Sequence, residues 1–297
     1  MVETKILSPK KVAFITTDSS KLPYLELEAV AEILKKNGVE IEVVSYFDQK
    51  INWKNYNLIN FNGCTNYFQN IEKFRTFCAK ISRLKVKTHN PVSIILWNLE
   101  KNYLLDLAKA GFDVAPTIWV QKNQNINLES EVKKLGWQKI ILKPSLSAGS
   151  FNTEVFEINQ IEKAQNHLQK ITQLSAAMIQ QFLPEVIEVG EYSAIFLNKK
   201  FSHLVLKTPA NGDFRAGIRQ GANVKALKKS QHLELVNHAK KVINYLKQDL
   251  LYARVDMVKS DKIYLMELEL IEPLLYSDFT KDFAKKYAKE ILSLIQA

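Results

Sequence analysis

The chain has 297 residues, of which 46% are hydrophobic and 24% charged, a mixture typical of a globular protein with a sizeable core. No apolar run approaches the roughly 18 residues of a membrane span, and the N-terminus lacks the apolar centre of a signal peptide, so we expect a cytoplasmic protein without a membrane partner. The net charge of +10 suggests an anionic partner, but the lysines are scattered in pairs, which favours a solvated surface over a nucleic-acid interface.

The first third of the sequence alternates strands with helices. The expected strands are residues 11–16, 39–47, 58–61 and 91–97, and the expected helices run to Gly38 from an N-cap at Asp18 or Ser19 and over residues 71–84. Such alternation predicts a parallel sheet with helices on its faces. We therefore expect residues 1–96 to form a separate α/β domain.

The remainder of the chain mixes helices with antiparallel hairpins. The expected helices are 99–110, 128–135, one that ends at Ile171, 231–246 and 278–295. The expected strands are 115–120, 139–143, 153–158, 177–183, two strands within 191–208 that flank a turn at 198–200, and a hairpin of 251–258 with 262–270. This pattern therefore predicts an α+β fold for the remainder of the chain.

The stretch Y-L-M-E-L-E-L-I-E-P, residues 264–273, places two carboxylates in an apolar strand. Glu267 and Glu269 share one face because residues two apart in a strand point the same way, and Asp256 in the partner strand can face the same side. Mutual repulsion makes such a cluster costly unless a cation neutralises it, and hard oxygen ligands suit magnesium. Arg254 lies on the same face and suits an oxyanion. A solvent-exposed cluster of salt bridges is the alternative interpretation.

A second pattern, I-I-L-K-P-S-L-S-A-G-S, ends an apolar strand with Lys143 and continues into a loop of small residues. The backbone N–H groups of such a loop can cradle phosphate oxygens, and the lysine adds a positive charge. The residues concerned are Ser147, Ala148, Gly149 and Ser150. An ordinary turn is the alternative. Lys101, at the start of a helix, would by itself be a surface lysine.

Further candidates lie in the second half of the chain. The segment Gln180, Gln181, Phe182 and Leu183 leads into a proline-bearing connection that can offer backbone groups to a flat base, and Glu191 could reach ribose hydroxyls. A glycine-containing loop is flanked by Lys207, Arg215 and Arg219. This composition fits a basic lid over an anion, and it equally fits a solvated loop.

The order of these patterns along the chain is more specific than any one of them. With D-S-S at 18–20, I-I-L-K-P and its loop, R-V-D, and E-L-E followed by Pro273, the sequence resembles the ATP-grasp superfamily of carboxylate–amine ligases. The likeness is to prokaryotic-type glutathione synthetases and to the related small ligases that include the cycloserine-forming enzyme, and it covers nearly the whole chain. The resemblance implies a parallel-sheet domain at 1–96 and two α+β lobes, 97–180 and 181–297, that clamp ATP.

The resemblance also implies a role for each candidate. Lys101, Lys143 and the loop from Ser147 to Ser150 would contact the phosphates of ATP, with Lys207 beside them, while Gln180 to Leu183 would line the adenine slot and Glu191 would hold the ribose. Asp256, Glu267 and Glu269 would bind two magnesium ions. Arg254 would stabilise the acyl phosphate and the tetrahedral intermediate, and Arg215 and Arg219 would grip a substrate carboxylate or the transferred phosphate. Asp18, Ser19 and Ser20 would contact substrate at the end of the parallel sheet where ligands bind.

The sequence departs from the family pattern at two positions. Glu269 stands where most of the superfamily has asparagine, and Gly149 is the single glycine of a phosphate loop that is richer in glycine in glutathione synthetases. The N-terminal half, which usually selects the substrate, matches least, so glutathione synthesis itself is not implied.

The expected function is an ATP- and magnesium-dependent ligase that joins a carboxylate to an amine through an acyl phosphate, on small amino-acid-like substrates or by ring closure within one molecule. Two alternatives remain: a non-catalytic nucleotide-binding or regulatory protein, and a ligase that adds amino acids to a protein tail. Relatives commonly form homo-oligomers.

Overall fold

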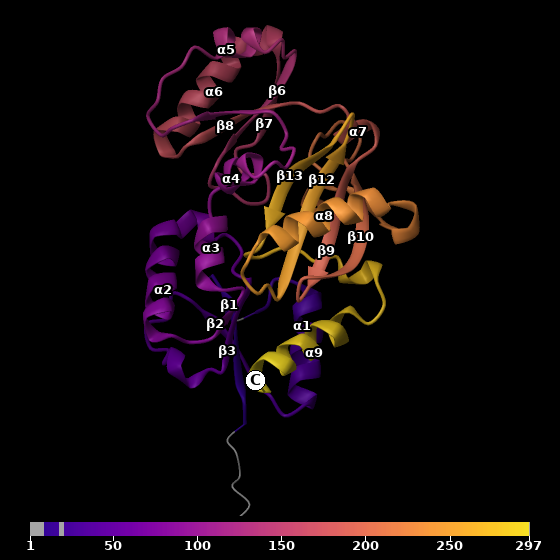
Figure 1. Cartoon of the computed structure of the whole chain (residues 1–297). Coiled ribbons are helices and arrows are strands. Elements are labelled where there is room, and N and C mark those ends of the chain that lie inside the picture. The colour runs from indigo at the N-terminus through magenta and orange to yellow at the C-terminus, as the bar shows by residue number, and fades with distance from the viewer. Residues whose placement is uncertain (1–8, 18–20, 297) are drawn as a thin grey trace, which may run out of the picture.

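The computed structural model describes residues 9–17 and 21–296. Within that part of the chain we find one parallel sheet and two antiparallel sheets, and Figure 1 shows them as three neighbouring parts, each with its own helices. None of the described helices has the length and apolar character needed to cross a membrane.

The N-terminal part is a parallel sheet in the order β2-β1-β3-β4, covered on both faces. Its strands are β1 (Lys11–Thr16), β2 (Glu40–Ser45), β3 (Leu58–Gly63) and β4 (Thr88–His89). Its helices are α1 (Leu25–Lys36), α2 (Ile71–Leu84), α3 (Val92–Asn98) and, from the far end of the chain, α9 (Phe283–Gln296). Alternate residues of β1 supply the two cores: Val12 and Phe14 pack with α1 and α9, whereas Ala13 and Ile15 pack with α2 and α3.

Two expectations for this part are wrong. Residues 91–97 are not the fourth strand, because the chain pairs at β4 and then forms α3 from Val92. The buried positions Val92, Ile94, Ile95 and Asn98 follow helical spacing, and Pro91 precedes the helix, where its missing N–H costs nothing. The first helix begins at Leu25 with Tyr24 in the N-cap position, so Asp18 and Ser19 do not cap it.

The central part is an antiparallel sheet in the order β5-β8-β6-β7 with helices on one face. Its strands are β5 (Thr117–Val120), β6 (Lys139–Pro144), β7 (Glu154–Glu157) and β8 (Ala177–Gln181). Its helices are α5 (Leu128–Lys134) and α6 (Ile161–Leu174). Leu168 and Ile171 of α6 pack on Ile140, Leu142 and Ile179 to form its core.

The C-terminal part is an antiparallel sheet in the order β11-β10-β9-β12-β13. Its strands are β9 (Glu191–Leu197), β10 (Lys200–Thr208), β11 (Asn223–Leu227), β12 (Tyr252–Lys259) and β13 (Ile263–Glu269). Helix α8 (Leu233–Tyr245) covers one face, α4 (Tyr103–Lys109) packs beside it, and the short α7 (Glu185–Glu188) leads into β9. Strand β11 is an element that the sequence reasoning did not predict.

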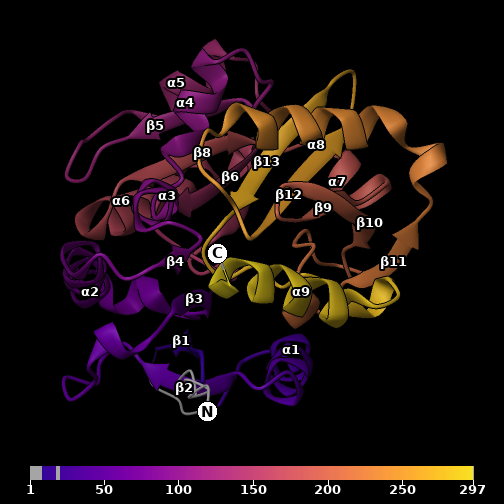
Figure 2. The same cartoon turned by 60° about the horizontal axis from the view of Figure 1, so that its bottom comes forward.

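The parts are tied together by contacts between distant segments. Helix α9 returns from the C-terminal sheet to pack along α1 (Figures 1 and 2). The Asn90 side chain donates to the carbonyls of Tyr252 (3.0 Å) and Leu270 (2.7 Å), and Asn98 donates to that of Leu268 (2.8 Å). These amides anchor the β12–β13 hairpin to the N-terminal part, and thereby fix its position against the rest of the molecule.

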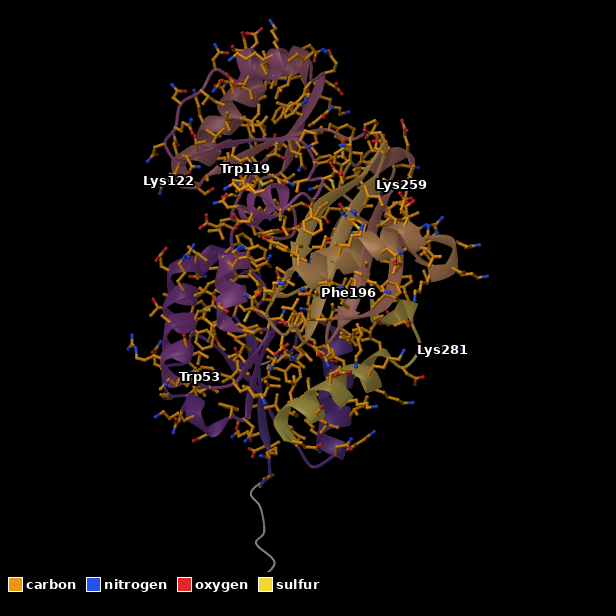
Figure 3. All side chains as sticks on the ribbon, in the orientation of Figure 1. Trp53, Trp119, Lys122, Phe196, Lys259 and Lys281 are labelled. Carbon is orange, nitrogen blue, oxygen red and sulfur yellow. The ribbon has the colours of Figure 1, made fainter. Side chains whose placement is uncertain are left out.

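Figure 3 labels two buried aromatic residues and three exposed lysines. Trp53 and Phe196 are buried, whereas Lys122, Lys259 and Lys281 are exposed on different parts of the molecule. This distribution fits the expectation that the excess positive charge belongs to a solvated surface.

Candidate active site

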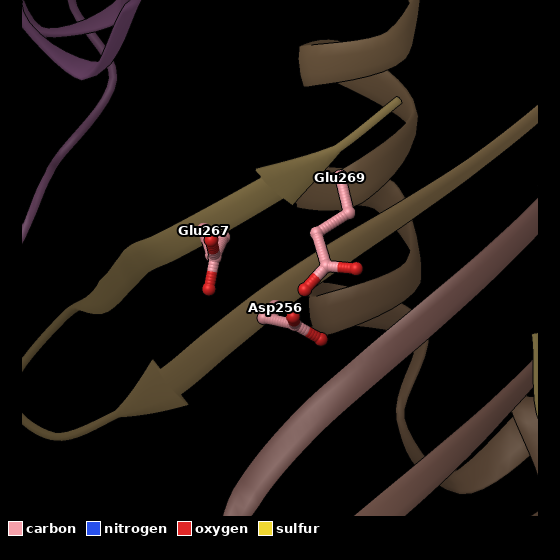
Figure 4. A group of neighbouring side chains, drawn as sticks. All are labelled: Asp256, Glu267 and Glu269. Atoms are coloured by element: carbon pink, nitrogen blue, oxygen red, sulfur yellow. The ribbon is translucent and has the colours of Figure 1, made fainter. Parts of the chain in front are cut away.

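The acidic residues of the site lie on the hairpin of β12 and β13. Antiparallel pairing sets Asp256 opposite Glu267 and Arg254 opposite Glu269. Oxygens from Asp256, Glu267 and Glu269 lie within 4.8 Å of one another, and Figure 4 shows the three side chains on one side of the hairpin. The pleat of β13 puts Glu267 and Glu269 on one face, because side chains two residues apart point the same way. A register shift between Asp256 and Met257 brings Asp256 opposite Glu267.

Two buried cations neutralise Asp256. The Nε of Arg254 lies 3.1 and 3.0 Å from its two carboxylate oxygens, and the Nζ of Lys207 lies 3.4 Å from Oδ1. Ser193, its neighbour on β9, donates a hydroxyl hydrogen bond to the same oxygen. Burial alone would raise the pKa of Asp256, but Arg254 and Lys207 outweigh burial and hold that pKa below its usual range. Asp256 is thus held as a carboxylate within a satisfied buried network.

Arg254 is held from several sides. It forms an ion pair with Glu269, and its Nη1 donates to the carbonyl of Leu274 at 3.1 Å. The guanidinium carbon lies 5.6 Å from the centre of the Tyr276 ring, within the range of a cation–π contact. A guanidinium fixed in this way can stabilise a developing oxyanion without reorganising.

Two lysines lie near the acidic hairpin: Lys101, from the turn between α3 and α4, and Lys143, from β6. The Nζ of Lys101 lies 3.1 Å from Glu267 and donates to the carbonyl of Ser147 at 2.7 Å, so this lysine connects the hairpin to the small-residue loop. Lys143, on β6, donates to the side-chain oxygen of Gln180 at 3.2 Å. Burial lowers the pKa of Lys143 to about 8. Lys101 is buried, in contrast to the surface lysine that its local sequence alone suggests.

Glu267 and Glu269 titrate differently. Burial would raise the pKa of both, but Lys101 and Lys143 keep that of Glu267 below its ordinary value. For Glu269, burial and the neighbouring carboxylates outweigh Arg254 and raise the pKa to about 8. Glu269 is therefore the carboxylate of the three whose charged form its surroundings disfavour, and a bound cation would favour that charged form. Three converging hard oxygen donors fit a divalent cation such as Mg²⁺.

A cavity of about 350 Å³ opens between the hairpin, the small-residue loop and the start of α1. The residues predicted as site members that line it are Lys101, Ser147, Ala148, Gly149, Arg219, Arg254, Glu267 and Glu269. The basic loop meets the small-residue loop here, since Gln220 lies within hydrogen-bond distance of the Gly149 carbonyl at 3.5 Å. Gly149 has φ of +61°, a conformation that favours glycine.

The other predicted residues that the structure describes do not line this cavity. Gln180, Gln181, Phe182 and Leu183 run from the end of β8 toward β9, with Gln180 fully buried and Lys139 placed 4.6 Å from the Phe182 ring centre. Glu191 pairs with Lys207, and Ser150 follows the lining residues of the loop. Arg215 is bound by Asp213 within its own loop, at 2.8 Å, and does not line the cavity. Asp18, Ser19 and Ser20 lie outside the described residues.

Among the residues at or beside the cavity that were not predicted from the sequence, four bear directly on its chemistry. Tyr24, Glu272 and Tyr276 line it, and Ser193 binds Asp256 behind it. Ser193 could have been found, because it follows Glu191 by two in a strand and therefore shares its face. Tyr24 and Glu272 are 248 residues apart, and no local pattern indicates that they meet.

The family comparison agrees with this geometry. The prokaryotic glutathione synthetase ATP-grasp domain matches residues 105–281, more than half of the chain. The protein therefore belongs to this ATP-grasp family and is an ATP-dependent ligase that forms C–N bonds between a carboxylate and an amine. Enzymes of this kind use ATP, typically with Mg²⁺. Residues 12–90 match the N-terminal domain of D-cycloserine synthetase DcsG.

Individual relatives also match over most of the chain. The cycloserine biosynthesis protein DcsG of Streptomyces lavendulae is 23% identical over 294 residues, which cover 93% of this chain and 96% of DcsG. The crystal structure of D-cycloserine synthetase DcsG has a TM-score of 0.81 at 22% identity, covering 96% of this chain and 99% of its own. D-alanine–D-alanine ligase from Bacillus anthracis complexed with ATP has a TM-score of 0.68 at 15% identity, covering 97% and 96%. The expected ATP-grasp fold is thereby confirmed.

Proposed function

We propose that this ligase phosphorylates the carboxylate of a small amino-acid-like substrate with ATP and joins the resulting acyl phosphate to an amine, in a second molecule or in the same one. The observation that carries the proposal is that one cavity gathers Arg254 and Lys101 beside Glu267 and Glu269. Its volume of about 350 Å³ is at the small end for ligand pockets, which favours small molecules over a protein tail.

The nucleotide is assigned to predicted residues that lie on the two antiparallel sheets and on the loops that connect to them. Lys101 and Lys143 bind its phosphates, and the loop from Ser147 to Ser150 closes over them, because both lysines lie near Glu267 at the mouth of that loop. The segment from Gln180 to Leu183 offers backbone groups to the adenine. Glu191, at the start of β9, holds the ribose.

Asp256, Glu267 and Glu269 are assigned two magnesium ions, which they fit as converging oxygen donors. Bound Mg²⁺ would neutralise charge on the phosphoryl group during transfer. Arg254, fixed by Asp256 and Leu274, stabilises the oxyanion that forms when the amine attacks the acyl carbon. The loops that carry Gly149 and Gln220 exclude water, which would otherwise hydrolyse the acyl phosphate.

The test is ADP release from purified protein with ATP and Mg²⁺, across pools of L- and D-amino acids and small amino-acid derivatives. We expect one pool to stimulate release, and Glu267→Ala to lower the stimulated rate by at least about 100-fold, as for other groups that stabilise a transition state. Glu234→Ala is the matched control, since Glu234 is exposed and pairs only with Lys259 in the described chain.

Other outcomes would favour the alternative functions. If ATP binds but neither a pool nor a lysate protein stimulates ADP release, the outcome favours a nucleotide-binding module with this fold. If incubation of a lysate with ATP and glutamate adds glutamate masses to one protein in an enzyme-dependent way, the acceptor is a protein tail.

A further inference from the structure

One wall of the cavity is built around Glu272, three residues beyond the last predicted metal ligand. The hydroxyl of Tyr24 donates to its carboxylate at 3.0 Å and lies 3.2 Å from its backbone carbonyl. Glu26, two residues after Tyr24 and in the first turn of α1, accepts hydrogen bonds from the backbone N–H groups of Leu275 (2.8 Å) and Ser277 (3.2 Å). The start of α1 therefore holds this wall in place from both sides of Pro273.

The charged groups of the cavity can be matched in pairs, with two left over. Lys101 pairs with Glu267, and Arg254 pairs with Glu269. Glu272 has a neutral partner, Tyr24, and no ion pair within the described residues. Arg219 also lines the cavity without an acidic partner among them, from the loop opposite. One carboxylate and one guanidinium are thus available to a ligand.

The charged groups around Glu272 do not fully stabilise its carboxylate form. Burial raises its pKa to about 7, even though Tyr24, Arg254 and Arg219 all lower it. The protein therefore leaves this carboxylate short of positive charge. Arg219, in turn, lies beside the phosphate loop, since a Cβ on Gly149 would be 3.9 Å from its Nη1. A ligand carboxylate at Arg219 would consequently be close to the phosphates of a nucleotide held by that loop.

We propose that Glu272, positioned by Tyr24, binds the ammonium group of the substrate, while Arg219 faces the carboxylate that becomes phosphorylated. The substrate is then a zwitterionic amino acid or amino-acid derivative with a free amino group, rather than a hydroxy acid or a simple carboxylic acid. This inference rests on the ligase function proposed above and names the substrate class of the same site.

The test measures binding, so that it does not depend on turnover. Both enantiomers of serine and alanine are titrated by calorimetry into the protein with Mg²⁺ and adenylyl imidodiphosphate, against glycerate and lactate of each configuration. For the wild type we expect at least one amino acid to bind about 10- to 100-fold more tightly than its hydroxy counterpart, the range typical of a hydrogen bond to a charged group.

Three variants test whether Glu272 and Tyr24 cause the preference for amino acids over hydroxy acids. Glu272→Gln keeps the shape and removes the charge, and we expect the preference for the amino acid to fall to within about twofold, by the same hydrogen-bond range. Tyr24→Phe should weaken amino-acid binding and leave hydroxy-acid binding unchanged, a selectivity that a merely structural role would not produce. Glu234→Gln, on the exposed surface, is the matched control. Unchanged binding of adenylyl imidodiphosphate shows that each variant is folded.

The proposal is overturned if hydroxy acids bind as tightly as amino acids, if no probe binds, or if the preference survives in Glu272→Gln. It is also overturned if Glu272→Gln raises the Mg²⁺ concentration needed for nucleotide binding, because Glu272 would then be a metal ligand. ADP release separates this proposal from the ligase function. If amino acids bind more tightly than hydroxy acids but no substrate stimulates ADP release, the ammonium subsite is supported and the ligase function is overturned. If amino acids and hydroxy acids stimulate ADP release equally, the ligase function is supported and the ammonium subsite is overturned.

Discussion

Lys143 provides a test of the nucleotide site through its protonation. Burial lowers its pKa from 10.5 to about 8, with repulsion from Lys101 acting in the same direction and attraction by Glu267 opposing both. Phosphates next to Lys143 would favour its charged form and raise that pKa again. If Lys143 binds the nucleotide, binding must therefore take up a proton near pH 8, and the affinity must fall as the pH rises through this value.

The size of the effect follows from the two pKa values. With a pKa of about 8 in the free protein and a return to at least 10.5 in the complex, linkage predicts a Kd about 25-fold higher at about pH 9.5 than at about pH 7. In Lys143→Arg the guanidinium stays charged over this range, so that this part of the pH dependence disappears.

The assay is calorimetric titration of adenylyl imidodiphosphate with Mg²⁺ into wild type and Lys143→Arg between about pH 7 and pH 9.5, in two buffers of different ionisation enthalpy. The buffer dependence of the heat counts protons taken up by the wild type near pH 8. Titration of Glu269 and other shared groups contributes equally to both proteins and cancels in the comparison. Equal pH profiles for the two proteins would refute the assignment of Lys143 to the nucleotide.

Two further predictions concern stability and closure. Asp256→Asn should lower the free energy of unfolding by about 3 kcal/mol without any ligand, because it leaves Arg254 and Lys207 buried with one acid fewer, and a loss below about 1 kcal/mol in urea unfolding would contradict this. Phe151, beyond the phosphate loop, contacts Phe68 of the N-terminal part with ring centres 5.4 Å apart. Phe151→Ala should weaken ATP binding by about 2- to 10-fold and raise ADP release per ligated product, since the aromatic pair contributes about 0.5–1.5 kcal/mol to closure. An unchanged ratio of ADP to product would exclude this role.

The acidic hairpin could be predicted from sequence because its geometry is local. The strand period of two places Glu267 with Glu269, and Arg254 with Asp256, on one face of each strand. A register shift between Asp256 and Met257, the sign of a β-bulge, then sets Asp256 opposite Glu267, and this shift could not be read from the sequence. The same reasoning finds Lys143 at the end of β6. Patterns of this kind depend on residues that are neighbours along the chain or across one turn.

The α3 segment shows where local reasoning fails. Val92, Ile94 and Ile95 are β-branched and favour a strand, so propensity indicated β structure there. Tertiary packing decides otherwise, because Val92 and Ile95 pack on α2 and Asn98 must reach the backbone of β13. A helix brings all three to one side, whereas a strand would divide them between its two faces.

The ammonium subsite lies beyond sequence reasoning for a different reason. Tyr24 and Glu272 meet because α9 and the segment after β13 fold back on α1, a contact between the two ends of the chain. Neither residue belongs to a strand pattern or a glycine loop. The part of the site that would select the substrate is thus assembled by long-range packing, whereas the acidic hairpin and Lys143 at the end of β6, proposed to bind metal and nucleotide, lie in patterns that are local in the sequence.

Glu269 affects both the acidic hairpin and the proposed ammonium subsite. It places a carboxyl group where most of the superfamily has asparagine, and the register of the hairpin sets Arg254 directly opposite it. The same guanidinium binds Asp256 with its Nε, so one arginine holds carboxylates of both strands. Because Arg254 is engaged by Asp256 and Glu269, it does not pair with Glu272. The departure from the family pattern at Glu269 therefore helps to leave Glu272 available for a positively charged group of the substrate.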